Sequence, residues 1–313
     1  MTDELLMLMD PIESIRPAKD TSLALLLEAQ RRGYKLNITQ QGDLALRNGQ
    51  PWARMTEMRV HDDEEHWFDK LDSHWRPLQE VPLIFDRKDP PVDSHYIHDT
   101  RLLELAQRAG SRVVNDPQSL RDCNEKLFAL QYPDCCAPSL VARDADALRQ
   151  FVDQTGDVVL KPLDGMGGQS IFRSRAGDPN LNVILETLMG EHGNFVLAQK
   201  YLPEIAQGDK RILMIDGEPL DYALARMPQG TDFRGNLAAG GRGVGQPLSA
   251  RDREIAARVG PELKRRGLLL VGLDVIGDWL TEINVTSPTC ARELDAQFGL
   301  NIAGMLFDVI EAK

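Results

Sequence analysis

The first forty residues alternate between strand and helix patterns, and this alternation constrains the fold more than any other feature of the sequence. Residues 5–9 form an apolar run that predicts a buried strand. Leucines at helical spacing follow between a capping Asp20 or Thr21 and Gly33, and residues 34–39 predict a second strand. This strand–helix–strand unit predicts that an α/β domain opens the chain. The glycine spacing of a dinucleotide site does not follow the first strand, so a nicotinamide enzyme is not expected.

The length of the chain and the later element patterns predict further lobes of α+β character. With 313 residues, the chain exceeds one typical hydrophobic core. The opening α/β domain is expected to cover residues 1–122, a small central lobe residues 123–202, and a third lobe residues 203–313 with a long loop at 227–246. The expected elements are a hairpin turn at Asn48-Gly49, strands at 81–85, 113–114, 139–142, 158–161, 195–200, 211–215, 220–225, 268–275 and 279–285, and helices at 100–109, 144–154 and from a capping box at 249–252 to about 266.

Charge and hydropathy argue against several classes of partner. The net charge of −12, from 36 basic and 48 acidic residues, argues against non-specific nucleic-acid binding. No apolar run approaches the roughly 20 residues that cross a bilayer, and the acidic start lacks the basic region of a secretory signal. A cytoplasmic enzyme without nucleic-acid or membrane partners is therefore expected. The four cysteines, at positions 123, 135, 136 and 290, lack zinc or redox spacing and predict buried or half-buried reduced thiols.

Acidic and amide side chains near the C-terminus indicate a cation site. Glu282 and Asn284 are two residues apart on a predicted strand, so both point to one face. Asp274 lies on the preceding strand, and a two-residue turn at Gly277-Asp278 would place it on the wrong face. An odd-length turn or a bulge would bring the three together. Because Mg²⁺ takes carboxylate and amide oxygens and also binds substrate phosphates, these residues predict a metal site; a polar surface strand is the alternative.

A glycine-rich loop follows the strand that ends at Lys161. Gly165, Gly167 and Gly168 would let backbone N–H groups approach phosphate oxygens closely, which favours an anion-binding loop. The loop is not a Walker A motif, because no Gly-Lys-Ser/Thr opens a helix here. A hairpin loop without a special role remains the alternative.

A second glycine-rich segment carries several positive charges. Residues 226–243 hold five glycines and three arginines, a composition that cannot form a packed core element. Such a loop is typical of a lid that closes over anionic substrates and excludes water, although a passive surface loop has the same composition. Lys126 and Arg211, taken alone, are ordinary charged positions on a helix and in a turn.

Taken together and in this order, these segments resemble bacterial glutathione synthetase over essentially the whole chain. The matching stretches are residues 117–126, 160–168, 208–211, 234–243, 271–274 and 280–289, together with Asp10-Pro11 and residues 87–91 of the first domain. The stretch from about residue 37 to 75 matches poorly, and residues 75–76 and 84–86 also differ from the family. These departures affect expectations about peptide affinity and subunit contacts more than expectations about chemistry.

The resemblance implies an ATP-grasp fold behind a Rossmann-like pre-ATP-grasp domain, with ATP held between the two later lobes. It implies ligation of γ-L-glutamyl-L-cysteine to glycine through an acyl phosphate, giving glutathione, ADP and phosphate. It also implies Mg²⁺, with Mn²⁺ as a substitute, and a homo-oligomer, either a tetramer or a dimer. Two alternatives stay open: another ATP-grasp ligase that joins a carboxylate to an amine, and an ATP-binding regulatory protein without catalysis.

The resemblance also implies a role for individual residues of this chain. It implies Asp274, Glu282 and Asn284 as metal ligands. It implies that Arg211 and Arg226 face the transferred phosphoryl group and the acyl phosphate, and that Arg234 and Asn236 belong to the lid. Substrate contacts fall to Asn284, Ser287 and Thr289. Nucleotide contacts fall to Lys126, Lys161, Gly165, Gly167, Gly168, Gln199, Tyr201, Leu202 and Asp209.

Overall fold

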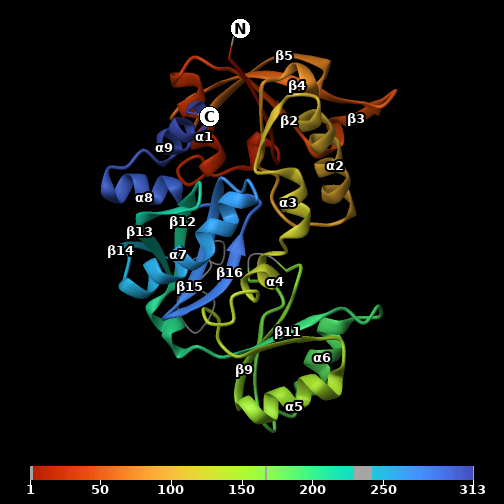
Figure 1. Ribbon diagram of the computed structural model, residues 1–313, viewed down its shortest axis with the longest axis vertical. Coiled ribbons are helices and arrows are strands. Elements are labelled where there is room, and N and C mark those ends of the chain that lie inside the picture. The colour runs from red at the N-terminus through yellow and green to blue at the C-terminus, as the bar shows by residue number, and fades with distance from the viewer. Residues whose placement is uncertain (1–2, 166–167, 229–241, 313) are drawn as a thin grey trace.

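The computed structural model describes residues 3–165, 168–228 and 242–312, and its three β-sheets follow one another along the long axis of the molecule (Figure 1). The sheet formed by the first residues lies at one end, and a four-stranded sheet lies at the other. A five-stranded sheet lies between them. The α/β fold class expected from the sequence is therefore confirmed.

The N-terminal sheet has seven strands in the order β3-β4-β2-β1-β6-β7, with β5 paired to β4. The β1, β2, β6 and β7 strands are parallel to their neighbours within this group, while β3, β4 and β5 extend the sheet with antiparallel pairs. Its elements are β1 (Glu4–Leu8), η1 (Ile12–Ser14), α1 (Thr21–Arg31), β2 (Lys35–Thr39), β3 (Leu44–Arg47), β4 (Gln50–Val60), β5 (Phe68–Pro77), β6 (Leu83–Asp86), α2 (Ser94–Arg108) and β7 (Arg112–Val114).

Local signals place the first helix and hairpin where the sequence predicts them. Asp20 caps α1, because its Oδ1 accepts the backbone N–H of Leu23 at 2.6 Å. Asn48 and Gly49 both have positive φ angles, 50° and 80°, which suit the two-residue turn between β3 and β4. The expected start of the next helix was wrong: α2 begins six residues earlier than residue 100, after a cap by Asp93.

The four-stranded sheet is antiparallel, in the order β10-β9-β11-β8, and two helices cover it. The chain reaches it through two short helices. Strand β10 and helix α6 were not predicted. The elements are α3 (Pro117–Asp122), α4 (Glu125–Ala129), β8 (Ser139–Ala142), α5 (Ala145–Thr155), β9 (Asp157–Pro162), β10 (Phe172–Arg175), α6 (Leu181–Met189) and β11 (Val196–Lys200).

The five-stranded sheet is also antiparallel, in the order β14-β13-β12-β15-β16. Ser249 and Asp252 form the predicted capping box at the start of α7. The expectation that a loop extends to residue 246 was wrong, because Arg242–Pro247 form strand β14. The elements are β12 (Asp209–Ile215), β13 (Glu218–Met227), β14 (Arg242–Pro247), α7 (Ala250–Arg265), β15 (Leu270–Ile276), β16 (Trp279–Asn284), α8 (Ala291–Phe298) and α9 (Ile302–Glu311).

The last two helices return to the first domain, so that both ends of the chain lie near each other (Figure 1). Helix α9 packs on α1 through one continuous hydrophobic core. Phe307 meets the Tyr34 ring edge-on with centroids 5.5 Å apart, and Arg32 donates to Asp308 at 2.6 Å. These contacts join the C-terminal helix α9 to the N-terminal domain.

Within the described residues, no helix has both the length and the apolar content needed to cross a membrane. All four cysteines are buried and free, as the sequence predicted.

Candidate active site

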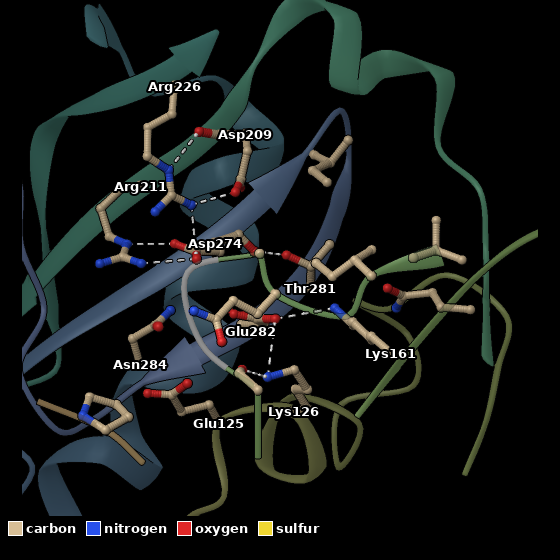
Figure 2. Close-up of a pocket in the computed structure, with 18 of the residues that line it drawn as sticks. Glu125, Lys126, Lys161, Asp209, Arg211, Arg226, Asp274, Thr281, Glu282 and Asn284 are labelled. Carbon is tan, nitrogen blue, oxygen red and sulfur yellow. Dashed lines mark hydrogen bonds and ion pairs between the residues drawn. The ribbon is translucent and has the colours of Figure 1, made fainter. Parts of the chain in front are cut away.

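A cavity of about 360 Å³ lies where the four-stranded and five-stranded sheets meet (Figure 2). Strands β9 and β11 supply one wall, strands β12, β13, β15 and β16 supply the other, and helix α4 and the loops at 89–90 and 286–289 close one end. Every site residue predicted from the sequence that the structure describes lines this cavity: Lys126, Lys161, Gly165, Gly168, Gln199, Tyr201, Leu202, Asp209, Arg211, Arg226, Asp274, Glu282, Asn284, Ser287 and Thr289. Gly167, Arg234 and Asn236 lie outside the described residues.

A β-bulge brings the predicted metal ligands together. The β15–β16 ladder pairs Ile276 with Trp279 across a two-residue turn, and then shifts register so that Asp274 pairs with Glu282. Without the bulge, the regular register would place Asp274 opposite Thr281. The sequence left an odd-length turn and a bulge open, and the structure contains the bulge. Asp274 and Glu282 consequently share one face of the sheet.

The same face carries two arginines, because the ladder aligns them with the acidic residues. Asp209 and Arg211 are two apart on β12, Asp209 pairs with Arg226 on β13, and Arg211 pairs with Asp274 on β15. Gly272 leaves room for this arrangement, since a Cβ atom there would lie 2.7 Å from Cδ of Arg211. Cross-strand register therefore assembles a group of two acids and two bases in the cavity wall.

Asp274 is the centre of this charged group. Arg211 donates to both of its carboxylate oxygens, from Nε at 2.5 Å and from Nη2 at 3.0 Å, and Nη2 of Arg226 lies 2.9 Å from Oδ2. Burial alone would raise the pKa of Asp274, but attraction to the two guanidinium groups outweighs burial and holds its pKa far below the usual range. Asp274 is therefore a permanent anion in the cavity wall.

For Asp209, burial outweighs the attraction of the neighbouring guanidinium group. It accepts a hydrogen bond from Nη2 of Arg226, yet one of its buried oxygens, Oδ1, has no hydrogen-bond partner among the described residues. Burial raises the pKa of Asp209 to about 6, opposed by Arg226 and reinforced by the nearby charge of Asp274.

Glu282 faces two lysines, Lys161 from strand β9 of the opposite wall and Lys126 from helix α4 at the end of the cavity. Nζ of Lys161 lies 3.2 Å from Oε1 of Glu282, and Nζ of Lys126 lies 3.6 Å from the same oxygen (Figure 2). Burial opposes ionisation of Glu282, but the two ammonium groups outweigh it and lower the pKa of the carboxyl. Nζ of Lys126 also donates to the carbonyl oxygen of Gly165 at 2.9 Å, which links helix α4 to the glycine-rich loop.

Glu125 is a site residue to which the sequence analysis gave no role. It begins helix α4, lines the cavity and is close enough to Thr286 for Oγ1 to donate to Oε1 at 3.4 Å. Burial, followed by repulsion from Glu282, raises the pKa of Glu125 to about 7. Glu125 directly precedes Lys126 in the sequence, and this neighbour was the one feature that could have indicated a place in the site.

The far end of the cavity, on the four-stranded sheet, is lined by mixed polar and apolar groups. Nε2 of Gln199 donates to Oγ of Ser139 at 3.1 Å, and Leu202 is buried. The guanidinium of Arg173 lies 3.5 Å from the centroid of the Tyr201 ring. These side chains form a partly apolar part of the lining next to strand β9, which carries Lys161.

The opposite end of the cavity is closed by contacts to the N-terminal domain. Ser287 donates a hydrogen bond to Oδ1 of Asp89. Arg87, which is buried, donates to Oγ of Ser22 at 3.1 Å and to the carbonyl oxygen of Pro288 at 2.9 Å. The loop that follows β16, and with it Thr289, is thereby fixed against the first sheet.

The donor set of this wall fits a hard divalent cation. Asp274 and Glu282 supply ionised carboxylates on one face, and Asn284 supplies an amide two residues further along β16. Hard cations such as Mg²⁺ prefer these oxygen ligands and retain positions for phosphate oxygens. The adjacent lysines and arginines supply positive charge for an anionic substrate on both sides.

The fold and this cleft define the chain as a protein of the ATP-grasp class. The structure is similar to D-cycloserine synthetase DcsG, with a TM-score of 0.65 and 16% identity, covering 96% of this chain and 99% of that one. It is also similar to a RimK domain ATP-grasp protein from Sphaerobacter thermophilus, with a TM-score of 0.62 and 18% identity, covering 97% and 98% of the two chains. At these identities the likeness establishes the fold alone.

Sequence comparison identifies the family. The family models for the N-terminal domain and the ATP-grasp domain of prokaryotic glutathione synthetase match residues 4–121 and 125–299. The glutathione synthetase of Xanthomonas axonopodis pv. citri is 60% identical over all of this chain and 99% of its own length. That of Pseudomonas aeruginosa is 57% identical over all of this chain and 99% of its own length. The chain therefore belongs to the prokaryotic glutathione synthetase family.

Proposed function

We propose that the cleft joins γ-L-glutamyl-L-cysteine to glycine at the expense of ATP, giving glutathione, ADP and phosphate. Membership of the glutathione synthetase family makes the chain an ATP-dependent ligase that forms carbon–nitrogen bonds. The observation that supports this chemistry most directly is the wall in which Asp274 and Glu282 stand opposite each other, between two arginines on one side and two lysines on the other.

The reaction requires a carboxylate to acquire a leaving group before an amine can attack it. ATP supplies its γ-phosphoryl group to the carboxylate of the peptide, which forms an acyl phosphate and ADP. The amine of glycine then attacks the acyl carbon, the new amide bond forms and phosphate leaves. Because phosphoryl transfer depends mainly on positioning and charge neutralisation, cationic side chains and a divalent cation meet its demands.

Mg²⁺ is the proposed cation, with Mn²⁺ as a substitute, and Asp274, Glu282 and Asn284 are its proposed ligands. The oxygen-rich donor set favours Mg²⁺ over metals that prefer nitrogen or sulfur. When bound, the cation would supply positive charge beside the nucleotide phosphates. Asp274 positions the two arginines beside the proposed site, and Glu282 positions the two lysines.

Lys126, Lys161 and the glycine loop are proposed to bind the nucleotide phosphates. Both ammonium groups converge on Glu282, so a phosphate beside that carboxylate would lie within reach of both. The surface formed by Gln199, Tyr201 and Leu202 suits adenine, because it combines aromatic and apolar side chains with one polar amide. Asp209, which lines the same cavity, is proposed to mark the edge of the nucleotide site, while Gly165, Gly167 and Gly168 would form the anion-binding loop.

Arg211 and Arg226 are proposed to stabilise the phosphoryl group in transfer and the acyl phosphate. Asp274 holds both guanidinium groups side by side, which pre-orients them before substrate binds. Asn284, Ser287 and Thr289 line the end of the cavity that faces the N-terminal domain and are proposed to contact the peptide or glycine. Arg234 and Asn236 are proposed to belong to a lid that keeps water from the acyl phosphate.

The chain is proposed to divide into domains at 1–122, 123–202 and 203–313, and to form a homo-oligomer, a dimer or tetramer. A cytoplasmic location is also proposed, and four buried free thiols are compatible with a reducing compartment.

The test of the reaction is ADP release by the purified full-length protein with Mg²⁺-ATP, γ-glutamylcysteine and glycine. We expect release to require all three substrates, and glutathione to be detected by mass. Controls that omit each substrate in turn distinguish ligation from idle ATP hydrolysis. Tight ATP binding without release in the complete mixture would overturn the substrate assignment while leaving the ATP site intact.

A further inference from the structure

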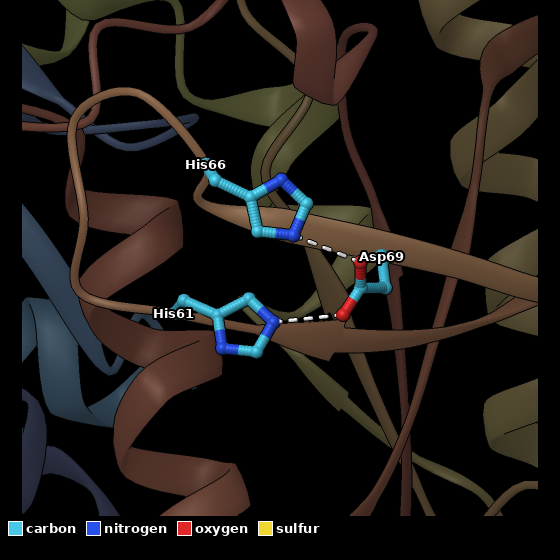
Figure 3. A group of neighbouring side chains, drawn as sticks. All are labelled: His61, His66 and Asp69. Atoms are coloured by element: carbon cyan, nitrogen blue, oxygen red, sulfur yellow. Dashed lines mark hydrogen bonds and ion pairs between the residues drawn. The ribbon is translucent and has the colours of Figure 1, made fainter.

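Two histidines and an aspartate gather at the tip of the β4–β5 hairpin, on the N-terminal sheet (Figure 3). His61 directly follows β4, His66 lies in the connecting turn, and Asp69 is the second residue of β5. None of the three is among the described residues that line the active-site cavity. The cluster therefore has no part in the chemistry proposed above.

One carboxylate holds both imidazole rings. Nε2 of His61 lies 2.8 Å from Oδ2 of Asp69, and Nε2 of His66 lies 2.9 Å from Oδ1. The two rings stack with centroids 5.3 Å apart and planes 22° from parallel. All three ligand atoms lie within 4.8 Å of one another. Three potential metal ligands thus converge on one small volume, as Figure 3 shows.

Hydrogen bonds hold the backbone of the hairpin tip in place at both histidines. Oδ1 of Asp63 accepts the backbone N–H of His66 at 2.8 Å, and the backbone N–H of His61 donates to the carbonyl oxygen of Trp67 at 2.9 Å. The indole of Trp67 in turn donates to the carbonyl oxygen of Ile12 at 2.9 Å. The hairpin tip is therefore anchored on both sides of the cluster, and the hydrogen bonds to Asp69 keep the two rings beside each other.

We propose that His61, His66 and Asp69 form a binding site for a first-row transition-metal ion of the Zn²⁺ type. Two imidazole nitrogens and one carboxylate oxygen are ligands that Zn²⁺ accepts, and a fourth position would remain for water. Mg²⁺ is a poor match, because it favours oxygen ligands. The site thus differs in chemistry from the oxygen-lined wall at Asp274 and Glu282.

Side-chain movements alone can bring the three ligand atoms to the separations of a metal site. Ligand atoms in a tetrahedral zinc site are about 3.3 Å apart, given metal–ligand distances of about 2.0–2.1 Å. The present separations of 2.8 and 2.9 Å, which run to different oxygens of Asp69, would widen by a fraction of an ångström, and the two histidine ligand atoms, which lie within 4.8 Å of each other, would approach to a similar distance. The side chains have room to move, because His66 is 67% exposed and His61 and Asp69 are each 42% exposed. Each Nε2 atom would give up its proton to Nδ1 or to solvent, and a bond to the ion would replace its hydrogen bond to Asp69.

The surroundings favour a cation and connect the site to the rest of the molecule. Residues 62–65 of the hairpin tip are all acidic and exposed, which makes the local potential negative. Asp62 also pairs with Arg292 of helix α8, the helix that follows the loop carrying Thr289. A bound ion would close the hairpin tip and hold it in the position that contacts α8. We therefore assign the ion a structural role at the joint between the first sheet and the C-terminal helices.

The test is Zn²⁺ binding by the full-length protein, measured by competition with a chromophoric chelator in excess Mg²⁺. Excess Mg²⁺ keeps the oxygen-lined site out of the measurement. We expect one Zn²⁺ per chain, and an affinity at least about tenfold weaker in His61→Gln, His66→Gln and Asp69→Asn, since each removes a ligand. His74→Gln is the matched control, because His74 is an exposed histidine on the same strand β5 and lies outside the cluster.

Thermal unfolding supplies the second measurement. Zn²⁺ should raise the melting temperature of the unsubstituted protein and of His74→Gln, and should leave that of His61→Gln unchanged. Failure of the unsubstituted protein to retain Zn²⁺ against the chelator would overturn the proposal. Retention with equal strength by all three cluster variants would also overturn it, because the ion would then sit elsewhere, for example at a thiol.

Discussion

Asp274 stands directly opposite Glu282 in the β15–β16 ladder, one residue out of the register that the intervening two-residue turn would impose. The bulge that causes this shift turns two isolated acidic residues into a pair that faces one cavity. On one side of the pair lie two arginines, and on the other lie two lysines. A metal–nucleotide complex requires anionic ligands for the cation and positive charge for the phosphates, and this wall supplies both. The two acids differ in their partners, because Asp274 contacts the arginines and Glu282 contacts the lysines.

Replacing Glu282 with Gln should lower the turnover number by roughly 10²-fold, which corresponds to about 3 kcal/mol in the barrier. The amide keeps the size of the side chain but removes the charge that Lys126 and Lys161 share. ADP release and glutathione formation measure the loss. Thermal unfolding should show a folded protein, and turnover equal to that of the unsubstituted protein would exclude Glu282 from the reaction.

Replacing Asp274 with Asn should destabilise the fold by about 3–5 kcal/mol, because it leaves two buried guanidinium groups without their shared counter-charge. Arg211 and Arg226 both contact this carboxylate and are themselves buried. Urea unfolding gives the free energy. Glu282→Gln is the matched comparison, and its expected loss is smaller because the side chain of Glu282 is 21% exposed, whereas that of Asp274 is 5% exposed. Equal losses in the two variants would contradict the division of roles between the two acids.

The local features of the fold were predictable because they depend on neighbouring residues. The cap at Asp20, the turn at Asn48-Gly49 and the capping box at Ser249 each involve residues within four positions of one another. Helix α6 was missed: its N-terminus, at Asn180, has no side-chain cap. Strand β10 was also missed, since its sequence Phe-Arg-Ser-Arg has only one apolar residue.

The site was predictable only in part, since long-range contacts decide its geometry. The pattern of Glu282 and Asn284 predicted one shared face, but the choice between an odd-length turn and a bulge required the structure. The contact of Lys161 with Glu282 joins residues 121 positions apart, and no local pattern encodes it. The pair His61 and Asp69 was missed for the same reason, because only the hairpin brings them together.

Replacing Asp86 with Asn should flatten the pH dependence of stability between about pH 4 and pH 7. Asp86 is fully buried in the N-terminal domain, and burial, reinforced by the charge of Asp99, raises its pKa to about 7 against a hydrogen bond from the backbone of Lys88. The folded state therefore holds a proton that the unfolded state releases near pH 4, so stability falls as pH rises through this window.

The difference in unfolding free energy between Asp86→Asn and the unsubstituted protein should shift by about 2–3 kcal/mol in favour of the variant from pH 5 to pH 8, at 1.36 kcal/mol per pKa unit. Urea unfolding at both values measures it. Asp72→Asn, at an exposed carboxyl on β5, is the control and should show no comparable shift. A constant difference for Asp86→Asn would mean that this carboxyl is already ionised at pH 5.

Replacing Gly260 with Ala should destabilise the lobe that contains the five-stranded sheet, although alanine is the better helix former. Gly260 lies in helix α7 and packs on Gly217, in the turn between β12 and β13, and a Cβ atom there would lie only 2.1 Å from the carbonyl oxygen of Gly217. Alanine gains about 1 kcal/mol in helix propensity, whereas overpacking against backbone costs typically 1–3 kcal/mol. Because backbone cannot swing aside as a flexible side chain can, we expect the steric cost to lie at the upper end of this range, with a net loss of up to about 2 kcal/mol in urea unfolding. A gain in stability would show that α7 can move away from the turn. The helix would then pack less closely on the five-stranded sheet than the contact between the two glycines indicates.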